Sequence, residues 1–307
     1  MKPRVSTIAL TFIAGMWLAT PAWTATFSFT TGSPDGRLGA LSRPASPAGI
    51  ETETADDFIL PQTTVITGAK IFGLIPLGTP LDHVTQVEVE IYHVFPKDSV
   101  SPPDNKVPSR VNSPGDVEIA SATRDSSRGT LSFNASLAIT SVTVPKSVVN
   151  NISVGSGGDG PATGEAVEIT INFTTPIILP AGFLPGDQYF FRPEVLVTGG
   201  NFLYLSTTKP ANFPGTTTPD LQAWIRNSNL APDWLRIGTD IIGGTTFNMS
   251  FSLSGFTVPE AGTPGQANCH GVTISALAAE FGSVDAAART FGASVKTVQN
   301  AVRLFCK

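Results

Sequence analysis

The chain has 307 residues and a formal net charge of −5 at pH 7, and only 14% of its residues are charged. A weakly charged, mildly acidic surface lacks the clustered lysines and arginines that attract nucleic acids and anionic membranes, so we expect neither as a partner. The 29 glycines and 25 prolines favour short strands joined by many turns and argue against a protein of long helices.

Residues 1–24 predict a signal peptide. Lys2 and Arg4 precede an uncharged apolar run from Ile8 to Ala19, and small residues follow at Ala22 and Ala25. The run is shorter than the ~20 residues of a transmembrane helix, so we expect it to be removed rather than kept as an anchor. No later apolar run is long enough to span a membrane. We therefore expect a secreted or envelope-associated protein without a transmembrane anchor.

Residues 25–256 predict one all-β domain, an antiparallel β-sandwich or jelly roll. In Val87–Ile91 the apolar side chains alternate toward a core, while Glu88 and Glu90 would face water. The same alternation recurs in Val167–Phe173 and Phe247–Leu253. Further strands are expected at Phe27–Thr31, Asp57–Leu60, Thr64–Leu74, Thr130–Phe133, Tyr189–Val197 and Asn201–Ser206. No helical pattern alternates with these strands, which argues against a parallel α/β sheet.

Residues 257–265 predict a linker, because proline and glycine recur in it. The apolar periodicity then changes and predicts a module of three short helices within residues 266–307, over 272–281, 284–291 and 295–305. The expected helix caps are Ser283 and Ser294 at N-termini and Gly282 and Gly292 at C-termini.

The two cysteines, Cys269 and Cys306, stand near the two ends of this module. Two cysteines in an exported chain most often pair, so we expect a disulfide between them. A loop of this size is worth about 4 kcal/mol in the chain-entropy model. Because three short helices bury little core, the bridge would supply much of the module's stability.

Several segments within residues 26–255 resemble one class of exported bacterial proteins. The segments are Glu53–Phe58, Thr63–Leu77, Glu90–Tyr92, Tyr189–Phe191, Asp233–Arg236 and Phe247–Gly255. They are similar to exported β-sandwich proteins of the PEP-CTERM-associated type, many of which end in a Pro-Glu-Pro sorting tail with a membrane helix. Here Val258-Pro259-Glu260 is followed by Ala261 instead of proline. The resemblance implies an extracellular or envelope-associated protein in which the cysteine-bearing module replaces the sorting tail, and it implies no catalytic residues.

No residues have the spacing of a metal site. The three histidines, His83, His93 and His270, have no neighbouring partner at HxH or HxxxH spacing, and the cysteines are too far apart for a zinc knuckle. The densest carboxylates are Asp56 and Asp57, which are weak candidates for Ca²⁺ because that ion needs six or more converging oxygens. A solvated strand face is the favoured interpretation, so we expect neither a metal nor a cofactor.

No residue is nominated as catalytic, because no G-x-S-x-G elbow and no particular carboxylate pair stands out. Trp224 and Trp234 flank the polar loop Asn227–Pro232 and are candidate ligand-binding residues. Aromatic faces suit sugar rings, although tryptophan is more often buried in a β core.

The tail also has the spacing of a helix-turn-helix, with Ala287, Ala288, Gly292 and Val298 at packing and turn positions. Residues 266–307 carry a net charge of only +2, which is weak for phosphate binding. The sequence thus predicts an exported, non-enzymatic structural or partner-binding protein whose partner is an extracellular glycan or protein. The alternatives are a carbohydrate-binding module or carbohydrate-active enzyme accessory, and a DNA-binding tail.

Overall fold

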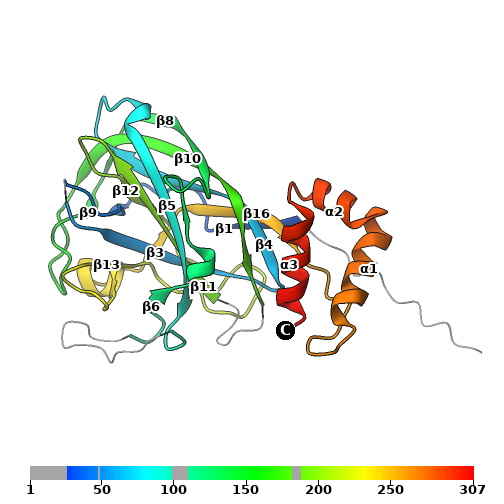
Figure 1. The fold of residues 1–307 in the computed structure, drawn as a ribbon. Coiled ribbons are helices and arrows are strands. Elements are labelled where there is room, and N and C mark those ends of the chain that lie inside the picture. The colour runs from blue at the N-terminus through cyan, green and yellow to red at the C-terminus, as the bar shows by residue number, and fades with distance from the viewer. Residues whose placement is uncertain (1–25, 48, 99–109, 182–187) are drawn as a thin grey trace, which may run out of the picture.

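The computed structural model describes residues 26–47, 49–98, 110–181 and 188–307, so the predicted signal peptide lies outside the described residues. This part of the chain is mostly β, with two sheets and three α-helices side by side at one end (Figure 1). None of its helices has the length and apolar character needed to cross a membrane.

The first sheet, sheet 1, has the strand order β1-β16-β4-β12-β2-β9, and β10 joins it by pairing with β4 on one side and β8 on the other. The strand bounds are β1 Thr26–Thr30, β2 Leu38–Leu41, β4 Thr64–Ile75, β8 Ser132–Val144, β9 Lys146–Val148, β10 Ala162–Leu179, β12 Leu203–Thr207, β15 Asn248–Met249 and β16 Phe251–Thr257. The pairing is antiparallel except between β2 and β9.

The second sheet, sheet 2, has the order β14-β13-β3-β11-β5-β6, and β7 also pairs with β5. The strand bounds are β3 Thr52–Ile59, β5 Val84–Val94, β6 Pro114–Glu118, β7 Arg124–Asp125, β11 Gln188–Val197, β13 Trp224–Asn227 and β14 Leu235–Arg236. Short 3-10 turns lie at Leu81–His83 and Ala120–Ala122, and a π-helical turn lies at Ile237–Ile242.

The main core joins side chains from the inner faces of both sheets. Ile71 and Ile169 of sheet 1 and Ile91 of sheet 2 are fully buried, and Phe191 of β11 stacks on Phe251 of β16 with ring centroids 4.9 Å apart. The inward alternation predicted for Val87–Ile91 is therefore confirmed.

The prediction that Glu88 and Glu90 face water is wrong. Glu90 is only 9% exposed and Glu88 is half-buried. The reason is that the outer face of sheet 2 is covered by other segments of the chain. The Trp234 ring packs against Tyr92 of β5, with ring centroids 5.6 Å apart, and shares a buried cluster with Ala55 and Phe190, so the segment around Trp234 covers part of this face.

The helices run over Cys269–Phe281 (α1), Val284–Thr290 (α2) and Val295–Phe305 (α3). The side chains of Ser283 and Ser294 accept hydrogen bonds from the third backbone N–H beyond them, at 3.0 and 3.1 Å, which is the N-cap geometry expected from the sequence. Gly282 has a φ of 82° at the end of α1, a left-handed conformation that glycine adopts without strain.

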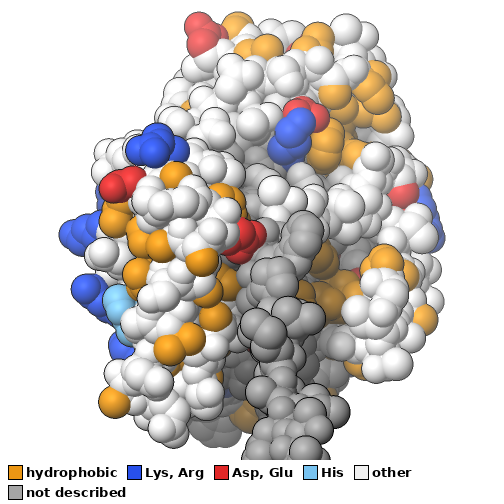
Figure 2. Space-filling model, turned by 90° about the vertical axis from the view of Figure 1, so that its right-hand side faces the viewer, with side chains coloured by type: hydrophobic (Ala, Val, Ile, Leu, Met, Phe, Trp, Pro, Cys, Tyr) orange, Lys and Arg blue, Asp and Glu red, His pale blue; other side chains and the backbone are white. Residues whose placement is uncertain are grey.

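The helices share a second, separate core with one end of sheet 1. Leu277, Val298 and Val302 are buried against one another, and Val65 and Val258 join them from the β region. The Phe256 ring of β16 stacks on Phe291 with centroids 4.0 Å apart. Figure 2 views this end of the molecule and shows charged side chains scattered singly among apolar and uncharged surface.

Candidate functional site

The disulfide between Cys269 and Cys306 is present, as predicted, with 5.7 Å between the two Cα atoms. It fixes the linker as well as the helices. The Gly265 N–H donates to the Cys306 carbonyl at 3.1 Å, and the Gly262 N–H donates to Thr273 Oγ1 at 3.1 Å. A Cβ on Gly262 would lie 2.9 Å from the Cys269 sulfur, so the linker packs directly on the bridge. The linker therefore forms a wall that is tied to α1 and α3.

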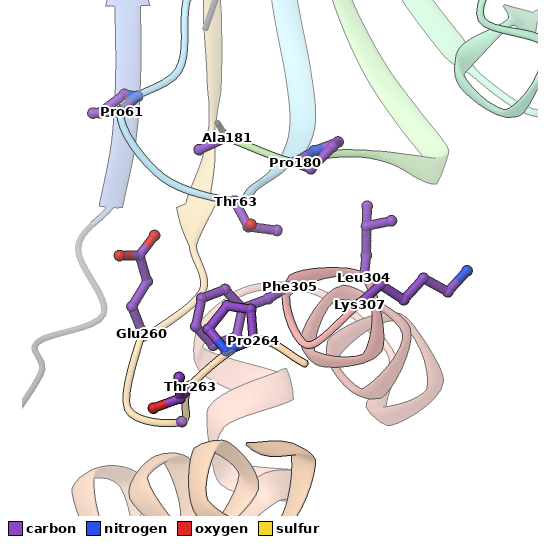
Figure 3. Close-up of a pocket in the computed structure, with 11 residues that line it drawn as sticks. Pro61, Thr63, Pro180, Ala181, Glu260, Thr263, Pro264, Leu304, Phe305 and Lys307 are labelled. Atoms are coloured by element: carbon purple, nitrogen blue, oxygen red, sulfur yellow. The ribbon is translucent and has the colours of Figure 1, made fainter. Parts of the chain in front are cut away.

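A hollow of about 730 Å³ lies where this wall, the end of α3 and the loops at the ends of three strands meet (Figure 3). Its lining residues come from the β3–β4 turn, the end of β10, the linker and the end of α3. They are Pro61, Thr63, Pro180, Ala181, Glu260, Gly262, Thr263, Pro264, Leu304, Phe305 and Lys307. Most of this surface is proline and aliphatic or aromatic side chain.

A second hollow of about 530 Å³ lies between α3 and sheet 1 and shares Leu304 and Lys307 with the first. It is lined by Ser121, Arg124, Thr175, Pro176, Ile178, Asn300, Arg303, Leu304 and Lys307. We call the two hollows together the junction groove. The groove therefore follows the C-terminal part of α3 along its contact with β10.

Arg124 contributes a buried positive charge to this groove, and no carboxylate of the described segments lies within ion-pair distance of it. Its guanidinium donates to the carbonyls of Ser121 at 3.0 Å, Thr123 and Pro176 at 2.7 Å each, and also to that of Thr175. Burial lowers the pKa of Arg124, as expected for a cation held by neutral groups. The four carbonyl acceptors fix the guanidinium while leaving its charge uncompensated.

Arg303 and Lys307 add two further cations from α3. The Arg303 guanidinium donates to the Asn300 side chain at 3.3 Å, and among the described residues neither cation has a carboxylate within ion-pair distance. Part of their charge offsets the partial negative charge at the helix C-terminus. Within the part of the chain that the structure describes, the only carboxylate side chain that lines the groove is that of Glu260.

The groove can therefore bind an anion beside an apolar surface. Its described lining residues include three cations and one carboxylate side chain, a positive local charge in a chain whose net charge is −5. These described residues include no histidine and no carboxylate pair, the groups that general acid–base chemistry most often uses.

A network of buried ions occupies the covered outer face of sheet 2. Arg192 of β11 contacts Glu53 of β3 at 3.0 Å, Glu90 of β5 at 2.6 Å and Glu194 at 2.6 Å. Arg226 of β13 pairs with the other oxygen of Glu53. We call this set, with Glu51, Glu88 and Tyr92 at its margin, the sheet 2 ion network.

The carboxyl groups of this network differ in their ionisation. Burial acts to raise the pKa of Glu53, but the Arg192 and Arg226 guanidiniums outweigh it and hold the pKa below its ordinary value. Burial raises the pKa of Glu194 well above its ordinary value despite the opposing charge of Arg192, and the neighbouring carboxylates Glu51, Glu53 and Glu88 add to the rise. Burial also raises the pKa of Glu88, to about 7, and the neighbouring Glu90 adds to this. The network therefore holds protons as well as charges.

Trp224 and Trp234, predicted as ligand-binding residues, are buried, with 1% and 0% of their surface exposed. They offer no open ring face on which a sugar could stack. Instead, the Arg226 guanidinium lies 4.5 Å from the centre of the Trp234 ring, and that of Arg236 lies 5.7 Å from Trp224. The two indoles thus support arginines through cation–π contacts. Beside them lies a smaller pocket of about 280 Å³, whose lining includes Glu51, Glu53 and Arg226.

Asp56 and Asp57, the weak Ca²⁺ candidates, point to opposite sides of β3. Asp56 accepts the Met249 N–H at 2.8 Å, whereas Asp57 accepts the Leu221 N–H at 3.2 Å and the Gln188 amide at 3.1 Å. Both are fully buried rather than solvated, and burial raises the pKa of each well above its ordinary value. In the described ranges no three acidic, histidine or cysteine side chains are arranged to hold a metal ion.

The histidines also remain in separate local contacts. His93 Nδ1 contacts the Asp98 carboxylate, and burial lowers the pKa of His93. His83 Nδ1 lies 3.3 Å from the Thr198 carbonyl, and His270 lies in the first turn of α1. The three histidines therefore do not form a common site.

Sequence reasoning missed the junction groove and the sheet 2 ion network. Arg124 is far in the chain from Arg303 and Lys307, and only folding brings it to them. The network had a weak signal, since Arg192 and Glu194 interrupt the apolar residues of β11 and Arg226 follows Trp224 at strand spacing. Comparison with protein families, characterised proteins and solved structures finds no match to this chain.

Proposed function

We propose that this chain is an exported, non-enzymatic binding protein of the cell envelope or extracellular space, and that it holds an anionic partner in the junction groove. The observation that carries the proposal is the group of three cations in the groove, Arg124, Arg303 and Lys307, that have no carboxylate partner among the described residues. Uncompensated cations beside an apolar wall favour an anion over a neutral ligand.

The partner that fits best is an acidic, partly apolar peptide segment. The groove offers four prolines, Leu304 and Phe305 to apolar side chains, and its cations to carboxylates. A polysaccharide would need aromatic faces and several polar side chains, and among the described residues Phe305 is the only aromatic one that lines the groove. The burial of both candidate tryptophans also removes the main support for a glycan platform.

Export is supported by the N-terminal sequence and by the disulfide, because disulfides persist in oxidising compartments. We further propose that residues 25–256 form a β-sandwich of jelly-roll type and that residues 266–307 are an appended three-helix module. The resemblance to exported PEP-CTERM-associated proteins is in keeping with this proposal. Sequencing the N-terminus of the protein recovered outside the cell tests export, and we expect cleavage between Ala22 and Ala25.

Groove binding is tested with a fluorescent poly-L-glutamate chain as the probe and polygalacturonate as the sugar arm. In the double variant Arg303→Gln/Lys307→Gln, we expect the affinity for poly-L-glutamate to fall by about tenfold, since two exposed ion pairs contribute roughly 0.5–1 kcal/mol each. The matched control is Arg289→Gln/Lys296→Gln, which removes two exposed cations of α2 and α3 that do not line the groove.

Equal losses in the two double variants would show non-specific attraction and refute the groove as the site. Stronger binding of polygalacturonate than of poly-L-glutamate would favour the glycan alternative instead. Binding by the parent protein that does not weaken with added salt would exclude an electrostatic site, because salt screens such contacts.

A further inference from the structure

Strand β8 is an open edge of sheet 1. It pairs with β10 on one side, and on the other side it forms no ladder with any described strand. Nine of its thirteen residues are exposed, including Leu137 at 44% and Ile139 at 53%. An open edge presents unpaired backbone N–H and C=O groups that can pair with another strand.

This edge lacks the usual protection. No charged residue and no proline occurs in Ser132–Val144, and the charge-free stretch extends from Gly129 to Pro145. Natural proteins commonly guard exposed edges with lysine, proline or an inward charge. A register shift does follow Leu137 in the pairing with β10, but the six residues Ser132–Leu137 pair regularly with Val167–Asn172. The regular part of the edge is therefore flat enough to accept another strand.

The sequence of this stretch complements itself. Phe133, Ala135 and Leu137 lie opposite Ile171, Ile169 and Val167 of β10, all of which are core residues, so the three share the core-facing side. In an antiparallel pair centred on Ala135, Phe133 of one copy lies opposite Leu137 of the other, and Ala135 lies opposite itself. On the other face Asn134 lies opposite Ser136. Apolar residues thus lie opposite apolar residues and polar residues opposite polar ones, and no like charges meet.

We propose that β8 pairs antiparallel with β8 of a second copy of this chain, about a two-fold axis at Ala135. A symmetric edge brings each residue near its own equivalent, so a charged edge would repel itself, whereas an uncharged one does not. Five residues, Phe133–Leu137, pair about this axis and extend over about 17 Å, which is a small interface. The dimer is therefore weak and depends on protein concentration.

The first test is analytical ultracentrifugation of the mature protein from about 1 µM to about 1 mM, a range that covers association free energies of roughly 4–8 kcal/mol. We expect a monomer–dimer equilibrium within this range and at least a tenfold weaker association in Leu137→Lys. The control is Val272→Lys, which places the same charge at a 40% exposed apolar position of α1. A monomer at every concentration would overturn the proposal, as would equal effects of the two variants.

The second test locates the two-fold axis. The native cysteines are paired, so Ala135→Cys introduces the single free thiol. Opposed Cα atoms in an antiparallel pair lie about 4.5–5.5 Å apart, within disulfide range. We expect Ala135→Cys to cross-link to itself. We expect Thr143→Cys, which is exposed on the same strand but lies outside the paired segment, to form the same weak dimer without a cross-link. Cross-linking of Thr143→Cys at an equal rate would refute this register, and a dimer whose Ala135→Cys variant does not cross-link would refute it too.

Discussion

Removal of the Cys269–Cys306 bridge is expected to weaken the helices and leave the sheets intact. The bridge joins residues 37 positions apart, and in the chain-entropy model the closure of such a loop is worth about 4 kcal/mol. The helices have their own hydrophobic cluster, which touches the β region mainly through Val65, Phe256 and Val258. Removal of the bridge should therefore lower mainly the free energy of local opening of the helices.

Native-state hydrogen exchange of the double variant Cys269→Ala/Cys306→Ala measures this effect directly. A loss of about 4 kcal/mol raises the opening constant by roughly 10³, so amides of α1 and α3 should exchange that much faster. Amides of β5 and β11, which lie in the main core, should keep their rates. The control is Val272→Ala, a change at a 40% exposed position of α1 that leaves the bridge in place.

Two results would contradict this reasoning. If the amides of β5 and β11 accelerated by the same factor as those of α1, the sheets and helices would unfold as one cooperative unit. If the helix amides did not accelerate, the bridge would add little to packing that the Phe256–Phe291 stack already provides.

Three other predictions concern the two cores and the ion network. The pKa of Glu88 rises from 4.5 in the unfolded chain to about 7, so its contribution to stability is complete below pH 4.5 and is lost as the pH rises to 7. We expect the free energy of unfolding, measured in urea at the two ends of this pH range, to fall less in Glu88→Gln than in the parent protein. An equal fall in the two proteins would refute the raised pKa of Glu88. Arg192→Gln leaves buried carboxylates without their cation and should lower the free energy of unfolding by about 3–5 kcal/mol in urea titrations, whereas a loss below 1 kcal/mol would contradict a buried network. Phe291→Ala should lower the stability of the helices by about 2 kcal/mol, which is less than for a fully buried ring because Phe291 is only partly buried. Hydrogen exchange should show this change in the helices and none of similar size in β11.

The strands that the sequence predicted are those with long alternation. Val87–Ile91 and Val167–Phe173 lie inside β5 and β10, because one side of each strand faces the core and the other does not. It missed β6 and all of β8 beyond Phe133, and several other strands that it missed, such as β2, β9 and β14, are two to four residues long. So short a segment carries no measurable period, and it becomes a strand only because a neighbouring strand pairs with it.

The candidate site was much harder to predict. The disulfide could be predicted from the cysteine count and the predicted compartment. The junction groove could not, because it depends on where α3 lies against β10. The error at Glu90 has a related cause. Alternation tells which side of a strand a residue occupies, but not whether another segment covers that side.

The sheet 2 ion network explains why a strand pattern that looks half-solvated is buried. Across the sheet, the charged side chains of neighbouring strands alternate in sign: Arg226 of β13, Glu53 of β3, Arg192 of β11 and Glu90 of β5. A slip of one residue in any of these pairings would move a charge into the apolar core between the sheets. Ionic groups in such a place add little net stability, because burial is costly for each of them. Their effect is to make every wrong register unfavourable, so this face of sheet 2 specifies its strand pairing through charge. The edge at β8 has no charged residues, so it carries no such penalty and remains able to accept another strand.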